Sequence, residues 1–197
     1  MTRVMLDSFT LRPAIITVAR LRPVVADYFG WPPTDTALRR ARQAGQIPAG
    51  APGRNGSGSA AIDLRQALLV PLALASGFLP QDAPAAAERI AAFPLVRRDE
   101  SNRGDPIRTP YTGRPVTLLD FMVSEVERCD ADHPPSSWRI SAAGACQALP
   151  DRLVFGNSPA ALTDPSNEVA WSCFIPARLL ADLAALFRHD DSATEAA

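Results

Sequence analysis

The sequence predicts a mixed α+β fold, with a helical N-terminal part followed by a small C-terminal part of helices and antiparallel strands. Apolar residues recur at helical spacing as far as about residue 93, and short alternating runs bounded by glycine and proline follow from residue 138. A glycine-rich stretch at 53–58 separates the second predicted helix from the third. With 197 residues, 47% hydrophobic and 21% charged, the chain can bury a core in one domain or two small ones.

The first two predicted helices are short and adjacent. An apolar stripe predicts a helix over 21–31, with Pro23 tolerated in the first turn and Gly30 at its end. A second helix is expected over 34–45, because two prolines precede it and Gly45 follows its last periodic residue. Its orphan amides would be capped by Thr34 or Asp35.

The second helix has two different sides. At about 100° per residue, one side collects small apolar residues, namely Ala37, Leu38, Ala41 and Ala44. The other side is polar and carries Thr36, Arg39, Arg40, Arg42 and Gln43. Guanidinium groups suit phosphate oxygens and the acceptor edge of guanine, and an amide suits adenine, so this side predicts contact with nucleic acid. The alternative is an arginine-rich face that is simply solvated.

A hairpin tip and two more helices are expected next. The glycines of 53–58 are typical of a tight turn, and Asp63 is a suitable cap for a helix that starts at Leu64. The run 67–80 indicates a buried helix that is kinked or broken near Pro71 and is too short to span a bilayer. A further helix is expected over 83–93, with Asp82 as its cap and Pro84 in the first turn.

This order of helix, turn, helix, hairpin and helix, over about residues 20–78, resembles the MerR-type winged helix-turn-helix superfamily. The matching residues are Leu38, Arg39, Arg40, Gln46, Ile47, Pro48, Asn55, Gly56, Asp63 and Leu64. The resemblance implies a recognition helix at 34–45 in the major groove of DNA and a wing at 53–58 on the backbone. The DNA-binding residues it implies, together with the polar side of the helix, are Thr34, Thr36, Arg39, Arg40, Arg42, Gln43, Arg54, Asn55 and Ser57. The sequence departs from the family at Arg40-Ala41 and at Ser57-Gly58, where many members carry aromatic residues.

The charge distribution agrees with this interpretation. The formal net charge of the whole chain is −1. Residues 1–65 hold nine arginines and four aspartates, a net +5, and residues 66–197 hold eleven arginines and seventeen acids, a net −6. The positive charge therefore lies in the part that resembles a DNA-binding motif.

The C-terminal part is predicted to be a separate α+β module. Residues 94–115 are rich in charge and turn-forming residues and indicate a linker or long loop. An amphipathic helix at 117–129, strands at 138–142, 152–155 and 169–175, and a helix at 176–187 are expected to follow. The expected division is a DNA-binding domain at 1–93, the linker, a dimerisation or protein-contact module at 116–188, and a disordered tail at 189–197.

No enzymatic constellation is evident in the sequence. Cys129 and His133 have the spacing of half a zinc site, but Cys146 and Cys173 have no partner at close spacing, so no metal is expected. The glycine-rich stretch has no lysine and so is not a phosphate-binding Walker loop. An odd number of cysteines and a charge near the N-terminus favour the reducing cytosol over secretion. We expect a non-enzymatic protein with no cofactor.

The sequence thus predicts a cytoplasmic, nucleoid-associated regulator of transcription that binds double-stranded DNA, acts as a homodimer and does not contact a membrane. RNA polymerase or another DNA-binding protein is a further expected partner, and the whole chain suggests a prophage or gene-transfer-agent origin. One alternative is an accessory protein of DNA packaging or recombination, similar to terminase small subunits or excisionases. Another is a C-terminal module that senses a small ligand. No long heptad run follows Leu64, unlike in MerR regulators that dimerise through a coiled coil.

Overall fold

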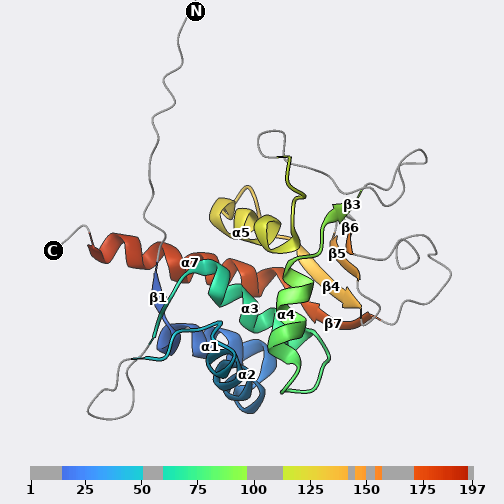
Figure 1. The fold of residues 1–197 in the computed structure, drawn as a ribbon. Helices are drawn as coiled ribbons and strands as arrows, with labels where there is room; N and C mark the ends of the chain where they lie inside the picture. Colours follow the sequence, from blue (N-terminus) through green and yellow to red (C-terminus); the bar gives the residue numbers. More distant parts are fainter. Residues whose placement is uncertain are drawn as a thin grey trace, which may run out of the picture.

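The fold is known from a computed structural model, which describes residues 15–50, 60–96, 113–141, 145–149, 154–156 and 171–194. Helices gather at the N-terminal side of the chain, and an antiparallel sheet forms from later segments (Figure 1). The mixed helix and strand composition predicted from the sequence is confirmed. The predicted wing at 53–58, including Arg54, Asn55 and Ser57, lies outside the described residues.

The first unit is a pair of helices joined through one glycine. Helix α1 covers Val18–Phe29 and helix α2 covers Trp31–Gln43. Gly30, between them, has a φ of 84°, a conformation that side chains with a Cβ rarely adopt, and its N–H donates to the Ala26 carbonyl over 2.8 Å. The predicted tight turn is therefore present, and its geometry requires glycine.

A short two-stranded sheet joins this pair to the next helix. Strand β1 (Ile16–Thr17) pairs antiparallel with β2 (Ala61–Ile62), which places the start of α1 beside the start of α3. Helix α3 covers Leu64–Ala75 and helix α4 covers Ala83–Ala91. Asp63 caps α3 as predicted, and Gln66 returns a hydrogen bond to the Asp63 amide, which completes a capping box.

The larger sheet has five antiparallel strands in the order β3-β6-β5-β4-β7. The strands are β3 (Leu95–Val96), β4 (Ser137–Ser141), β5 (Ala145–Leu149), β6 (Val154–Gly156) and β7 (Trp171–Ile175). Trp138 lies opposite Ala148 on β5 and opposite Ile175 on β7, and all three side chains are buried. Arg139 lies opposite Phe174, and both are exposed, so the sheet has one covered face and one open face.

Helices α5 (Leu118–Arg128) and α7 (Ala177–Thr194) complete the layer next to the sheet (Figure 1). Phe121 of α5 packs edge-on against Trp138 and Phe155, with ring centroids 5.9 and 5.6 Å apart. Glu125, one turn further along α5, accepts a hydrogen bond from Trp138 Nε1 over 3.2 Å and others from the Ser136 amide and hydroxyl. The buried indole nitrogen is therefore satisfied.

The two halves of the chain share their core. A single cluster of buried side chains includes residues of α1 to α4 together with residues of the sheet, α5 and α7. Helix α7 contacts α1, and Tyr28 donates a 2.6 Å hydrogen bond to Asp182 between these helices. The division into domains 1–93 and 116–188 stays a prediction. The contacts between α1 and α7 join residues of these two predicted domains.

Several predicted boundaries were wrong. Helix α2 begins at Trp31 instead of residue 34, because Pro32 and Pro33 occupy its first turn, where their missing amides leave no partner unsatisfied. Helix α3 continues through Pro71 without a break, and Asp82 makes no side-chain capping bond to α4. Strand β5 was not predicted, the first residues of the expected linker form β3, and α7 continues to Thr194, beyond the predicted start of a disordered tail. No helix in the described part is long and apolar enough to cross a membrane.

Candidate nucleic-acid interface

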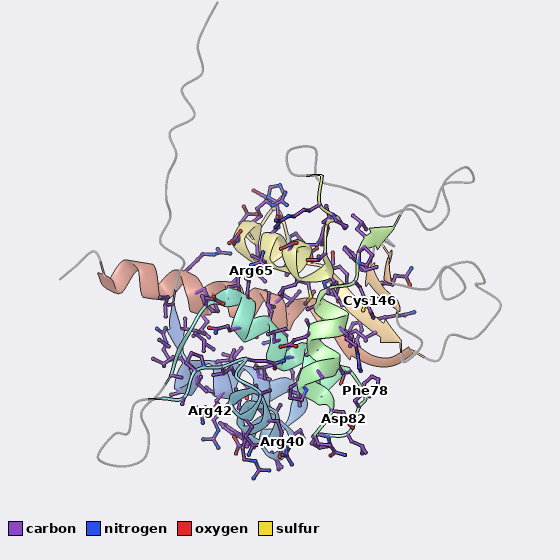
Figure 2. All side chains as sticks on the ribbon, viewed as in Figure 1. Arg40, Arg42, Arg65, Phe78, Asp82 and Cys146 are labelled. Carbon is purple, nitrogen blue, oxygen red and sulfur yellow. The ribbon has the colours of Figure 1, made fainter. Side chains whose placement is uncertain are left out.

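Helix α2 packs on three other helices through its small apolar residues. Ala37, Leu38 and Ala41 are buried, and α2 contacts α1, α3 and α4. At its C-terminal end, Gln46 is buried and its side-chain amide donates a 2.8 Å hydrogen bond to the Pro84 carbonyl of α4. The packing leaves the opposite side of α2 in solvent. In Figure 2, Arg40 and Arg42 lie at the end of the molecule formed by α1 and α2, away from the sheet.

Three predicted residues form the exposed stripe of α2. Arg39, Arg42 and Gln43 are exposed and lie three and four positions apart, so they are neighbours on one helix surface. Within the described part of the chain, the guanidinium groups of Arg39 and Arg42 make no hydrogen bond and no ion pair. Both guanidinium groups keep all five N–H donors available for a ligand.

Arg40 behaves differently from its neighbours. It is half-buried, its Nη1 donates a 2.9 Å hydrogen bond to Gln43 Oε1, and its Nε is buried with no partner among the described residues. The carbonyl oxygen of Gln43 is therefore occupied, while its side-chain NH₂ remains a donor. Bidentate contact with adenine needs both atoms, so Gln43 Oε1 would have to use its second lone pair or exchange its bond to Arg40.

The predicted threonines do not lie on this surface. Thr34 has no exposed surface, and its hydroxyl donates a 2.8 Å hydrogen bond to the Gly30 carbonyl. It neither caps the helix nor reaches a groove, because α2 begins at Trp31 and Thr34 falls on the same side as Ala37, Leu38 and Ala41. Thr36 is half-buried and lines a pocket beside the first turn of α2.

Sequence reasoning missed a cluster at the N-terminal end of α2. Arg22 of α1 holds the Asp35 carboxylate with two hydrogen bonds of 2.6 Å, and its guanidinium lies 4.9 Å from the ring centroid of Trp31. Trp31 is 48% exposed. Hydrogen bonding to Arg22 lowers the pKa of Asp35 below its usual value. Arg22 and Asp35 are thirteen positions apart in the sequence, a separation that gives no spacing signal, because the pair depends on how α1 and α2 cross.

The Arg22–Asp35 pair matters for the charge of this surface. Asp35 is the only acid of α2, and Arg22 compensates it. Described residues 15–50 hold five arginines and two aspartates, a net charge of +3. The exposed side of α2 is thus positively charged, and its single carboxylate already has a cation.

The cysteines and histidine lie elsewhere. Cys129, Asp130 and His133 line one pocket of about 530 Å³ with Arg128 and Arg188. His133 Nδ1 lies 3.0 Å from Asp130 Oδ1, and hydrogen bonds from the His133 backbone and ring lower the pKa of Asp130. Cys146 is buried on β5, and burial raises the pKa of its thiol. Among the described residues, no group of three histidine, cysteine or acidic side chains is arranged to hold a metal.

Searches among known protein families, curated proteins and solved structures find no match for this chain.

Proposed function

We propose that this chain binds double-stranded DNA through the exposed side of α2 and regulates transcription. The observation that carries the proposal is the state of Arg39 and Arg42. Both are exposed, neighbouring and without a partner among the described residues. A cation that makes no internal bond is free to neutralise a phosphate or to donate to guanine, since no protein contact has to break first.

The dimensions of α2 support binding in a DNA groove. Arg39 and Gln43 are one helical turn apart, about 5.4 Å along the axis, and successive base pairs are about 3.4 Å apart. Side chains on this stripe can therefore reach neighbouring base pairs or the phosphates beside them. The wing predicted at 53–58 would add Arg54 on the backbone, which completes the proposed winged helix-turn-helix.

Contact with a second copy is part of the proposal. One recognition helix reads only a few base pairs, so specific binding in this class of motif commonly uses two copies on two half-sites. A dimer raises the effective concentration of the second α2 at its half-site. The mass of the full chain in solution, measured by sedimentation with and without a mapped DNA site, tests this part. A monomer on its mapped site would contradict it.

A titration tests DNA binding itself. A fluorescently labelled, mixed-sequence duplex is titrated with the full chain, the double variant Arg39→Ala/Arg42→Ala, and Arg139→Ala as a control. Arg139 is exposed on the open face of the sheet and its side chain has no partner among the described residues, so its removal takes away one positive charge at a different place, against two in the double variant. We expect the double variant to lose affinity about tenfold or more and to show a shallower salt dependence by about two units. Equal losses in the double variant and in Arg139→Ala would overturn the assignment to α2.

Genome-wide mapping of bound sites distinguishes regulation from the alternative role in packaging or recombination. A regulator should be found at promoters, where RNA polymerase also binds, whereas an accessory factor should be found at one packaging or attachment site. If the titration is repeated with an RNA of the same sequence and the chain binds it more tightly than the duplex DNA, both the regulatory role and the packaging or recombination role are contradicted.

A further inference from the structure

A pocket of about 420 Å³ lies where α2, α3 and α4 meet. Its walls come from the N-terminal half of α2 (Pro32, Pro33 and Thr36), the last turn of α3 (Ala73), the connection after α3 (Phe78), and the start of α4 (Ala83). Of the nine described residues that line it, eight have apolar side chains and none is charged. We infer that this pocket binds a small, uncharged, apolar compound.

Phe78 is the main argument for a ligand. Its side chain forms one wall of the pocket and is nevertheless 46% exposed. A large aromatic ring left partly in water is unfavourable, and covering it with an apolar group is favourable in proportion to the area covered.

The connection that carries Phe78 is ordered. The Ser76 hydroxyl donates to the Ala73 carbonyl over 2.7 Å and accepts from the Phe78 amide over 3.3 Å. Gly77 has a φ of 69°, which allows the sharp reversal after α3. Arg89 of α4 lies over the ring, 5.5 Å from its centroid. Figure 2 shows Phe78 and Asp82 beside α4. These contacts fix the position of the wall, which lowers the conformational cost of binding.

The lining also sets the class of ligand. The alanines at positions 37, 73 and 83 each add only a methyl group to the lining, and Thr36 supplies the only polar side chain among the described lining residues. Small-molecule sites commonly enclose about 300 to 1,000 Å³ and combine an apolar lining with a few polar groups. An ion would lose its hydration here without gaining a charged partner from the lining. An aromatic or aliphatic compound with one hydrogen-bonding group fits the Thr36 hydroxyl.

Because Pro32, Pro33 and Thr36 belong to α2, a ligand in this pocket touches the first turn of the proposed recognition helix. An effect of the ligand on DNA affinity follows from this contact and rests on the proposed function. Binding of the ligand itself does not.

The probe is N-phenyl-1-naphthylamine, an uncharged compound with one N–H group that fluoresces more strongly in apolar sites. It is titrated into the full chain, into Phe78→Ala, into Ala83→Leu, which fills the pocket, and into Phe174→Ala. Phe174 is a matched control, since its ring is 47% exposed on β7 and does not line the pocket. Circular dichroism and urea unfolding verify that each variant is folded.

We expect saturable binding of one probe per chain, about tenfold weaker in Phe78→Ala, lost in Ala83→Leu and unchanged in Phe174→Ala. Should Ala83→Leu fail to fold, Phe78→Ala decides alone, because it truncates a side chain that is already half in solvent. No saturable binding, or equal weakening in Phe78→Ala and Phe174→Ala, would overturn the inference. Repeating the DNA titration with saturating probe then tests the effect on α2. A chain that binds the probe but no DNA refutes the proposed function and leaves the pocket standing.

Discussion

The two ends of the molecule use arginine in different ways. At the helical end, Arg39 and Arg42 have no partner among the described residues, and residues 15–50 carry a net charge of +3. Around α5, Arg65 pairs with Asp120 and Arg128 bonds to Ser124, and described residues 113–141 hold three arginines and five acids, a net −2. Arg65 and Arg128 are engaged in internal bonds, whereas Arg39 and Arg42 of α2 remain available to an outside anion. This difference, more than the number of arginines, supports a binding surface on α2.

The core of the sheet end should respond most strongly to mutation. Trp138→Ala removes a fully buried indole that packs against both Phe121 and Phe155, and takes away one donor to Glu125. We expect the free energy of unfolding to fall by about 3 to 5 kcal/mol in a urea titration. Phe174→Ala, on the open face of the same sheet, should cost less than about 1 kcal/mol. Equal losses of unfolding free energy in the two variants would contradict the description of one covered and one open face of the sheet.

The predicted wing should act through charge alone. If Arg54 touches a phosphate, Arg54→Ala should weaken binding to all duplexes by about fivefold and make the slope of log K against log salt shallower by about one unit. Fluorescence titrations at several salt concentrations, on a mapped site and on a mixed-sequence duplex, measure both quantities. A loss confined to the mapped site would mean that Arg54 reads bases.

The Arg22–Asp35 pair allows the charge argument to be tested in both directions. Arg22→Ala leaves the Asp35 carboxylate uncompensated on α2, so DNA affinity at low salt should fall about threefold. Asp35→Asn removes that carboxylate and should raise the affinity by a similar factor. Titrations at low and high salt check this, because high salt should reduce both changes. Changes in the same direction would indicate a purely structural role for the pair.

The smallest expected effect concerns the ion pair between α3 and α5. Burial raises the pKa of Asp120, but hydrogen bonds from Arg65 and Thr117 outweigh it, so the pKa lies below the usual value. A carboxylate with a lowered folded-state pKa stabilises the fold above about pH 4, and this contribution is lost as the pH falls through the folded-state pKa. Asp120→Asn should therefore cost ~0.5 kcal/mol at pH 7 and less at pH 3, since the pair is exposed and screened. Urea unfolding at the two pH values measures it, and a cost that grows toward pH 3 would contradict it.

Local signals explain which parts of the fold were predictable. Asp63 and Gln66 carry the whole capping box within four residues, so the start of α3 could be predicted to the residue. Strand β5 could not, because its sequence, Ala145–Leu149, contains no β-branched or aromatic residue and forms only between β4 and β6. Its stability comes from partners distant in the sequence.

The candidate site shows the same limit. The exposure of Arg39 and Arg42 followed from helical periodicity, which does not depend on the precise start of α2. The role predicted for Thr34 did depend on the residue at which α2 starts. Its spacing from Leu38 and Ala41 already predicted burial, but a helix start placed at 34 made it a cap. The cluster of Trp31, Arg22 and Asp35 depends on how two helices cross, and the pocket at Phe78 requires three helices to be placed together.

The most direct test of the central claim is an NMR spectrum of the arginine Nε–H groups of the full chain during titration with a mixed-sequence DNA duplex. Assignments come from single Arg→Lys variants. We predict that the signals of Arg39 and Arg42 shift first and furthest as DNA is added, while those of Arg65 and Arg139 stay in place. Shifts that appear at Arg139 and leave Arg39 and Arg42 unchanged would contradict this prediction.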